Sequence, residues 1–153
     1  MIRTMYLLDT NIFLIYSREN AASRALERSY GLLSNPTELF VSIVSLGEID
    51  ATIKKFNLGP RRSAVIEGLL SSATTTGIAF NEVVSAYGDI DAYSQGKLPN
   101  RGPFTARNMG KNDLWIAATA HVYELTLLTA DRDFDHLAGS YLDVEYVDLS
   151  KIT

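Results

Sequence analysis

The chain has 153 residues, of which 46% are hydrophobic and 21% charged, and its formal net charge is −4. These values fit one soluble globular domain, which we expect to span residues 1–153. Because the chain contains no cysteine, disulfides, zinc–thiolate sites and thiol catalysis are excluded, and a reducing, cytoplasmic setting fits. No apolar run approaches the about 20 residues that span a bilayer. The N-terminus leads directly into an apolar segment, so we expect neither a signal peptide nor a membrane partner.

The charge is unevenly distributed along the chain. Residues 1–112 contain 12 basic and 10 acidic side chains, whereas residues 113–153 contain 2 basic and 8 acidic ones. Two stretches, residues 54–62 and residues 97–112, carry basic charges only. Such local patches can bind a phosphate backbone while carboxylates nearby hold a cation. Composition alone also allows a solvated charged face.

The first elements of the chain are apolar and short. Residues Met5–Leu8 are predicted to form a buried strand. Ile12–Tyr16 would pass as a second strand by propensity, with Asp9–Asn11 as a turn between them. A helix that begins directly after Asp9 fits the pattern equally well, and hydrophobic periodicity does not decide between the two.

The middle of the chain alternates between helical and extended patterns. In order, we expect a helix over Ala21–Leu33, a strand over Leu39–Val41, a helix over Ile43–Phe56, a helix from Pro60 with an apolar face reaching Ala73, and a strand over Gly77–Phe80. Pro60 suits the first turn of its helix, because proline lacks the N–H that a first turn leaves unpaired.

The last third continues this alternation around one long loop. We expect a helix over Glu82–Tyr93, a loop over Leu98–Gly110, a helix ending near Glu124 with Asn112 as its N-cap, and strands over Thr126–Thr129 and Val144–Val147. Short apolar strands that alternate with helices predict an α/β protein, a three-layer α/β/α sandwich with a mainly parallel central sheet.

Four carboxylates stand where predicted strands or helices begin or end: Asp9, Glu48, Asp113 and Asp131. Ligands of parallel sheets gather at the carboxyl ends of the strands, and Asp9 and Asp131 directly follow strands. With neither histidine nor cysteine among them, the four acids indicate an oxygen-ligand site for Mg²⁺ or Mn²⁺. A water activated by that cation would then attack a phosphodiester.

Three of the four acids also have an ordinary structural explanation, whereas Glu48 lies on a helix among apolar residues and is expected to face something other than bulk water. Asp9 suits a turn or a helix cap, and the helix dipole favours Asp113 in a first turn. Asp131, with Asp133 and Asp135, would fit an acidic surface turn. Considered together these explanations weaken, because like charges at one edge repel one another unless a cation lies between them.

Three further observations concern the other acids and histidines, and a second class of α/β protein. Asp50 should point away from Glu48 and toward solvent, because the two are only two residues apart on one helix. His121 is expected to add little to the site, and His136, which follows the acidic turn, could touch substrate but better suits a surface or packing role. A receiver-type signalling domain would need paired acids after its first strand and a late lysine, and the segments around Asp9 and Asp131 do not supply that pattern.

Four segments of the chain, in order, resemble the motifs of PIN-domain nucleases, and in particular of VapC-type toxins from type II toxin–antitoxin pairs. These segments are Tyr6–Asn11, Ser45–Ile49, Asn112–Ala120 and Leu127–Phe134. The resemblance covers nearly the whole chain. It implies the PIN-like sandwich, with Ile12–Tyr16 helical despite its strand-like composition, and a Mg²⁺- or Mn²⁺-dependent endoribonuclease.

The resemblance also implies a role for each site residue. Asp9 and Asp113 would be direct metal ligands, Glu48 would hold metal or orient the attacking water, and Asp131 would add charge and position water or a second cation. The side chains expected to support these carboxylates are Thr10, Asn11 and Thr129, with Asp133 as an outer member of the site.

The partners implied are RNA, a second copy of the chain in a homodimer, and a small VapB-like antitoxin across the active-site groove. An antitoxin arginine or lysine would enter the carboxylate cluster, and the net charge of −6 over residues 113–153 suits a basic partner. Two alternatives stay open: a non-catalytic PIN-like module that binds RNA or a partner, and a housekeeping PIN ribonuclease. The sequence does not identify the RNA, because recognition of loops and ends depends on shape.

Overall fold

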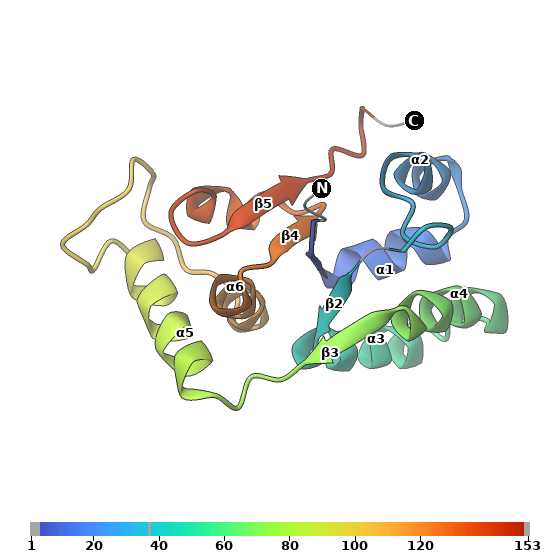
Figure 1. Ribbon diagram of the computed structural model, residues 1–153, viewed down its shortest axis with the longest axis horizontal. Helices are drawn as coiled ribbons and strands as arrows, with labels where there is room; N and C mark the ends of the chain where they lie inside the picture. The colour runs from blue at the N-terminus through green and yellow to red at the C-terminus, as the bar shows by residue number, and fades with distance from the viewer. Residues whose placement is uncertain (1–3, 37, 152–153) are drawn as a thin grey trace.

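A parallel β-sheet forms the centre of the computed structural model, which describes residues 4–36 and 38–151 (Figure 1). Its strand order is β3-β2-β1-β4-β5, and every neighbouring pair is parallel. The strands are β1 (Tyr6–Leu8), β2 (Leu39–Ser42), β3 (Ala73–Thr76), β4 (Thr126–Thr129) and β5 (Asp143–Tyr146). The predicted α/β/α sandwich is therefore confirmed, and the sheet is parallel throughout. The expectation of a single domain over residues 1–153 stays a prediction.

Helices connect the strands and cover both faces of the sheet. They are α1 (Thr10–Ser17), α2 (Ala21–Tyr30), α3 (Ile43–Lys55), α4 (Pro60–Ser71), α5 (Asn81–Ser94), α6 (Lys111–Tyr123) and the short 3₁₀-helix η1 (Arg132–Leu137). None of the helices in the described part of the chain has the length and apolar character that a bilayer crossing requires.

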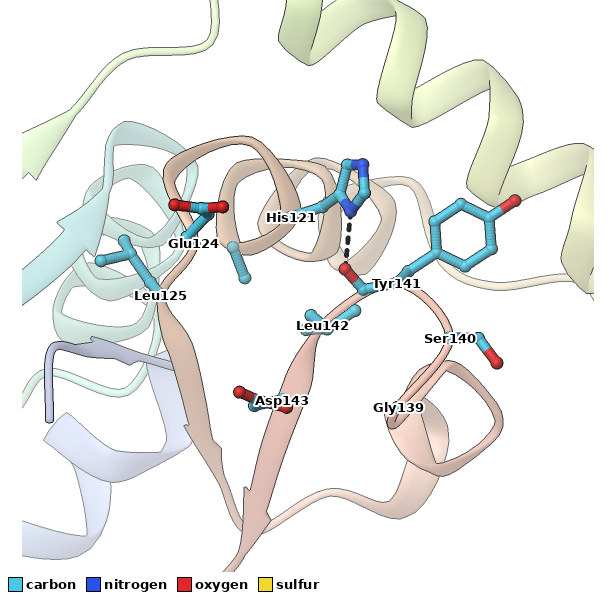
Figure 2. Close-up of a pocket in the computed structure, with 9 residues that line it drawn as sticks. His121, Glu124, Leu125, Gly139, Ser140, Tyr141, Leu142 and Asp143 are labelled. Carbon is cyan, nitrogen blue, oxygen red and sulfur yellow. Dashed lines mark hydrogen bonds between the residues drawn. The ribbon is translucent and has the colours of Figure 1, made fainter.

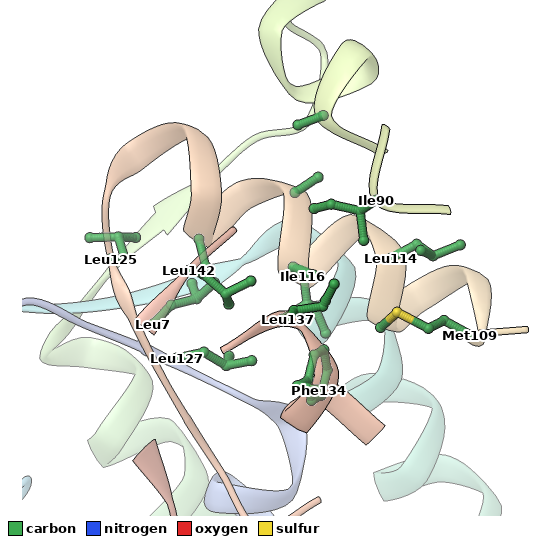
Figure 3. Packing of buried hydrophobic residues seen from close by; sticks show 14 of the residues in the cluster. Leu7, Ile90, Met109, Leu114, Ile116, Leu125, Leu127, Phe134, Leu137 and Leu142 are labelled. Carbon is green, nitrogen blue, oxygen red and sulfur yellow. The ribbon is translucent and has the colours of Figure 1, made fainter. Parts of the chain in front are cut away.

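The sheet divides the core into two clusters, because neighbouring residues of one strand point to opposite faces. Leu7 and Leu127 belong to the cluster that contains the buried side chains of α5, α6 and η1 (Figure 3). Leu8 and Leu128 belong to the cluster formed with α1, α2, α3 and α4. Each layer of helices thus has its own apolar core against the sheet.

The order of the strands creates a switch point between β1 and β4. From β1 the chain moves outward through β2 to β3, and it then returns to the other side of β1 to form β4 and β5. The backbone N–H of Asp9 donates to the carbonyl oxygen of Leu128 at 3.0 Å, which joins the two carboxyl ends. Ligands of open parallel sheets bind at such points.

The segment Ile12–Tyr16, which the sequence left open, is helical and belongs to α1. Asp9 is the N-cap of this helix and accepts a hydrogen bond from the backbone N–H of Thr10. Ile12, Phe13, Ile15 and Tyr16 are all buried. A helix that is apolar on every side lies inside a core, which explains its strand-like composition.

The predicted strand Gly77–Phe80 is wrong. The strand in this region is β3, and its residues pair with β2 from Leu39↔Ala73 to Ser42↔Thr76. Beyond that register β2 ends and α3 begins, so the following residues have no strand to pair with. Ala73, which we assigned to the apolar face of the preceding helix, instead begins β3, since α4 ends at Ser71.

The predicted N-cap of α6 is also wrong. The cap is Gly110 rather than Asn112, which lies exposed within the first turn. The backbone N–H of Leu114 donates to the carbonyl oxygen of Gly110 at 3.0 Å, so the first helical bond already starts there. Asp113 does lie in the first turn, as predicted. The last strand begins at Asp143, one residue earlier than expected.

Candidate active site

The candidate site begins with Asp9 at the carboxyl end of β1. Only 4% of Asp9 is exposed. Its Oδ1 accepts from the N–H of Thr10 at 2.8 Å, and its Oδ2 accepts from Thr129 Oγ1 at 2.7 Å. The side-chain amide of Asn11 donates to Oδ2 at 3.3 Å. These bonds hold the buried carboxylate in one orientation.

The same polar side chains join Asp9 to the end of β4. Thr129 Oγ1 also accepts from the backbone N–H of Asp131 at 3.0 Å. Asn11 Oδ1 accepts from the N–H of Ala130 at 3.2 Å. Thr129 is fully buried, whereas Asn11, Ala130 and Asp131 are half-buried. The polar residues predicted to support the carboxylates do contact them.

Glu48 reaches the site from α3 through Thr10. Thr10 Oγ1 donates to Glu48 Oε1 at 2.7 Å. Glu48 is half-buried, whereas Asp50 is exposed and forms an ion pair with Lys54 at 2.7 Å. The two acids of this helix therefore face different surroundings, as the sequence predicted.

A second group of acids comes from α6 and η1. Asp113, Asp131 and Asp133 each offer a carboxylate oxygen, and these oxygens all lie within 4.8 Å of one another. Asp131 is the N-cap of η1, and its Oδ1 accepts from the N–H of Asp133 at 2.9 Å. Asp133, expected as an outer member, belongs to this close group, while Asp9 is not one of the three.

The charges of the two acid groups act on one another. Burial raises the pKa of Asp9 to about 6, even though hydrogen bonds from Thr129 and Thr10 oppose the shift. The pKa of Asp113 is raised to about 7, first by burial and then by the charges of Asp9, Asp131, Glu48 and Asp133. Each added negative charge thus makes the next ionisation less favourable.

These residues fit a hard divalent cation. Every donor is a carboxylate oxygen, the ligand that Mg²⁺ and Mn²⁺ prefer. A cation would also relieve the repulsion that raises the pKa of Asp113. The carboxyl oxygen Asp113 Oδ2 would lie 3.8 Å from a Cβ at Gly110, so the loop that precedes α6 passes close to the site.

The two histidines lie at different places. His121 lines a pocket of about 340 Å³ next to Glu124, Leu125 and Asp143, at the amino ends of β4 and β5 (Figure 2). Its Nδ1 is 2.6 Å from the carbonyl oxygen of Tyr141. This pocket is at the edge of the sheet opposite to the carboxylates, since those follow the carboxyl ends of the strands.

His136 lies on η1, three residues after Asp133. Its Nε2 is 2.7 Å from Ser94 Oγ, and its Nδ1 is 3.3 Å from Arg107 Nη1. The sequence gave no indication of this contact, because its members come from α5, the long loop and η1. The signals that pointed to this region were the positive charges of residues 97–112 and the position of His136 just after the acidic turn.

Comparison with known proteins identifies the class of fold. The PIN domain model matches residues 6–140, and the chain therefore belongs to the PIN domain family. A comparison of the sequence with curated proteins finds no match.

The solved structures that the chain resembles include VapC-type proteins at low sequence identity. A chain of VapBC2 from Rickettsia felis, bound to a fragment of promoter DNA, has a TM-score of 0.74 and 21% identity, covering 94% of this chain and 98% of that one. VapBC-1 from nontypeable Haemophilus influenzae has a TM-score of 0.63 and 23% identity, with 97% and 100% covered. Mycobacterium tuberculosis VapC20, described as a Sarcin-Ricin loop cleaving toxin, has a TM-score of 0.60 and 14% identity, with 92% and 98% covered. These similarities show a shared fold.

Proposed function

We propose that this chain is a Mg²⁺- or Mn²⁺-dependent endoribonuclease and the toxin of a VapC-type toxin–antitoxin pair, acting on RNA in the cytoplasm. One observation supports the activity above all. Acids that follow β1 and β4, or that lie on α3, α6 and η1, come together at the switch point of a PIN domain, and burial together with their charges raises the pKa of Asp113 to about 7. A cluster of this kind is costly to ionise without a cation.

In this proposal Asp9 and Asp113 are the direct ligands of the cation. Asp131 and Asp133 add negative charge beside Asp113. Glu48, which Thr10 holds by a hydrogen bond, helps hold the cation or orients the attacking water by accepting a hydrogen bond from it. When bound, the cation would lower the pKa of water and stabilise the charge that grows on the phosphate.

The roles of RNA and of an antitoxin are supported by the proteins that share the fold. VapC20 carries the description of a toxin that cleaves the Sarcin-Ricin loop. The Rickettsia felis structure is a VapBC pair on promoter DNA. We infer that this chain forms a homodimer and that a VapB-like antitoxin blocks the acid cluster with an arginine or lysine.

The test of the activity compares three variants of the purified chain. With Mn²⁺ and a structured RNA, Asp9→Asn and Asp113→Asn should each lower the cleavage rate by at least about a hundredfold, because each removes a proposed ligand. Asp50→Asn is the matched control, since Asp50 is exposed on α3 and pairs with Lys54. It should cleave like the parent chain.

The outcomes separate the candidate functions. Equal cleavage by all variants would mean that a contaminant cuts the RNA. RNA binding without cleavage at any metal concentration would favour the non-catalytic binding module. Thermal unfolding of each variant shows whether a loss of activity reflects a loss of fold.

The toxin role is tested in cells. Induced expression of the parent chain should arrest growth, and Asp113→Asn should not. Growth arrest should be relieved by the product of a short adjacent reading frame, if that frame encodes the antitoxin. A parent chain that cleaves RNA in vitro but leaves growth unchanged would favour the housekeeping ribonuclease.

A further inference from the structure

A second cavity lies beside the acid cluster, and none of the predicted site residues lines it. Its volume is about 730 Å³. We call it the loop pocket, because it lies between the end of α5, the loop over residues 95–110 and η1. The side chains that matter for its chemistry are Tyr93, Phe104, Arg107, Arg132, Asp135 and His136.

The loop that forms this pocket is fixed to the body of the protein at its second half. The backbone N–H of Arg107 donates to the carbonyl oxygen of Ser94 at 2.8 Å. Met109 is buried in the same core cluster as Leu114 and Phe134 (Figure 3). The side chain of Arg107 is therefore carried by a fixed backbone, although it is itself exposed.

The contact between Ser94 and His136 holds the histidine ring in place. Ser94 Oγ lies 2.7 Å from His136 Nε2 and donates to Met109 Sδ at 3.4 Å. Arg107 Nη1 lies 3.3 Å from His136 Nδ1. Ser94 is fully buried as well. His136 is thus held as a neutral aromatic wall, and burial and the charge of Arg107 lower its pKa.

Aromatic rings line one side of the loop pocket. The ring centres of Phe104 and His136 are 4.9 Å apart, and those of Phe104 and Tyr93 are 5.2 Å apart. Phe104 is half-buried, so part of its ring is accessible. A Cβ at Gly102 would overlap the ring of Phe104 and lie 2.5 Å from Tyr93 Oη. Glycine at that position lets the loop bring Phe104 against its neighbours.

The charge that the loop pocket presents is positive. Asp135 is paired with Arg132 at 3.2 Å, and the Arg132 guanidinium also lies 4.0 Å from the centre of the Tyr146 ring. Arg107 makes its contacts with Asp133 and His136 through Nη1 alone, and both partners are uncharged groups, a carbonyl oxygen and a neutral ring. Its charge is therefore available to an anion in the pocket.

The loop pocket and the acid cluster share η1. Asp133 contributes its carboxylate to the cluster, and its carbonyl oxygen accepts from Arg107 Nη1 at 3.3 Å. His136 follows three residues later, about 6 Å along a 3₁₀-helix. An RNA strand that places one phosphate at the acid cluster would therefore bring the adjoining nucleotide to the loop pocket.

We propose that the loop pocket binds one nucleotide of single-stranded RNA next to the scissile phosphate, with the base against Phe104 and the phosphate on Arg107. This proposal rests on the proposed ribonuclease function. An aromatic face beside a single guanidinium matches a base and its phosphate, because bases stack on aromatic rings without sequence preference. The residues that bind the substrate would then include Phe104 and Arg107.

Binding of a short, unstructured oligoribonucleotide tests the proposal. Fluorescence anisotropy is measured in the full chain carrying Asp113→Asn, so that the readout does not depend on cleavage. Adding Phe104→Leu or Arg107→Ala should each weaken binding about tenfold, since one stacked base or one charged contact is removed. Arg107→Ala should also lower the slope of log K against log salt by about 0.7, and Phe104→Leu should leave it unchanged.

Arg101→Ala is the matched control in the same loop. Arg101 is exposed, and it is not one of the residues that line the loop pocket. It should change binding by less than about twofold, and Arg107→Lys should restore the salt slope because it restores the charge. Equal losses of RNA affinity in Arg101→Ala and Arg107→Ala would overturn the proposal that the loop pocket binds a nucleotide, because they would indicate general attraction by a basic loop.

Histidine NMR gives a second, independent measurement. The chain contains two histidines, and His136 lines the loop pocket while His121 lies at the opposite edge of the sheet. Titration with a nucleoside 5′-monophosphate should shift the ring signals of His136 in a saturable way and leave those of His121 unchanged. A shift of His136 with an acidic peptide but not with the nucleotide would refute the proposal and assign the pocket to a protein partner. A chain that binds nucleotide here yet never cleaves RNA would refute the ribonuclease instead.

Discussion

Asp113 is the residue at which burial and charge act in the same direction. It lies half-buried in the first turn of α6, and four other carboxylates oppose its ionisation. The helix dipole would by itself favour a negative charge at this position. The pKa is nevertheless raised to about 7, so the neighbouring acids and burial outweigh the helix dipole.

The raised pKa makes the stability of the metal-free protein dependent on pH. In the unfolded chain Asp113 loses its proton near pH 3.8, and in the folded chain near pH 7. Between these values the folded state binds more protons, so the free energy of unfolding should fall as pH rises from about 4 to about 7. Asp113→Asn should remove much of that fall. At pH 8 with EDTA it should raise the melting temperature by about 2–4 °C, or about 1 kcal/mol after allowance for solvent screening.

Asp50→Asn is the control for this measurement, because Asp50 is exposed and lies outside the acid cluster. Its melting temperature should follow that of the parent chain at each pH. A parent chain whose stability is flat between pH 4 and 7 would show that the carboxylates do not repel one another as the geometry indicates.

The sequence indicated at which ends of strands and helices the acids lie, but it did not indicate all of their contacts. Asp9 and Asp131 were found because each directly follows an apolar strand, a pattern that is local in the chain. The place of Asp133 beside Asp113 was not visible, because it depends on the turn of η1. The contact between Arg107 and His136 joins two residues that are far apart in the sequence and follow no helical or strand periodicity, so only the folded structure reveals it.

At the scale of elements, α6 combines a residue of the candidate site, Asp113, with core packing. Its alanines Ala117 and Ala118 are fully buried, and Ala120 is 1% exposed. Small side chains let a helix lie close to the sheet and to α5. The position of Asp113 is therefore set by how closely the rest of its helix can approach the core.

We expect Ala118→Leu to destabilise the protein by about 1–3 kcal/mol, because extra methylene groups would overfill a closely packed core. Urea unfolding measures this change. Val84→Leu adds volume on α5 at a position that is 53% exposed. It should leave the free energy of unfolding within about 0.5 kcal/mol of that of the parent chain. Equal effects of the two substitutions would show that α6 does not approach the sheet as closely as described.

The elements that were predicted correctly are those with a clear pattern, and the errors have physical causes. The composition of α1 is that of a strand, and its helical state follows from the Asp9 cap and from burial on all sides. The error at Gly77–Phe80 arose because propensity cannot tell where a pairing partner ends. Three consecutive threonines in β3 were the β-branched signal that the apolar residues after them obscured.

At the scale of the whole molecule, the candidate site joins both halves of the sheet. Asp9 follows β1, Glu48 follows β2, and Asp131 follows β4, so the acids meet only when the strand order is complete. A ligand that needs all of them binds the folded state alone. Such a ligand stabilises the fold in proportion to the logarithm of its concentration.

Mn²⁺ at about a hundred times its dissociation constant should therefore raise the melting temperature by about 5–10 °C, and EDTA should reverse the rise. Asp9→Asn should reduce this rise strongly, since Asp9 is a proposed ligand. Calorimetric titration with Mn²⁺ gives the dissociation constant that sets the concentration. A full rise in Asp9→Asn would place the metal elsewhere on the protein.

The two anchored ends of the loop before α6 have a consequence for how the protein can diversify. On one side the backbone N–H groups of Gln95, Gly96 and Lys97 bond back to α5, and on the other Arg107 and Met109 are fastened. The stretch between these two ends carries Phe104, whose ring packs against Tyr93 and His136. Insertions after Pro99 should therefore displace Phe104 but leave the two attachment points and the carboxylates in place, so they should alter which molecules the loop pocket binds without moving the acids.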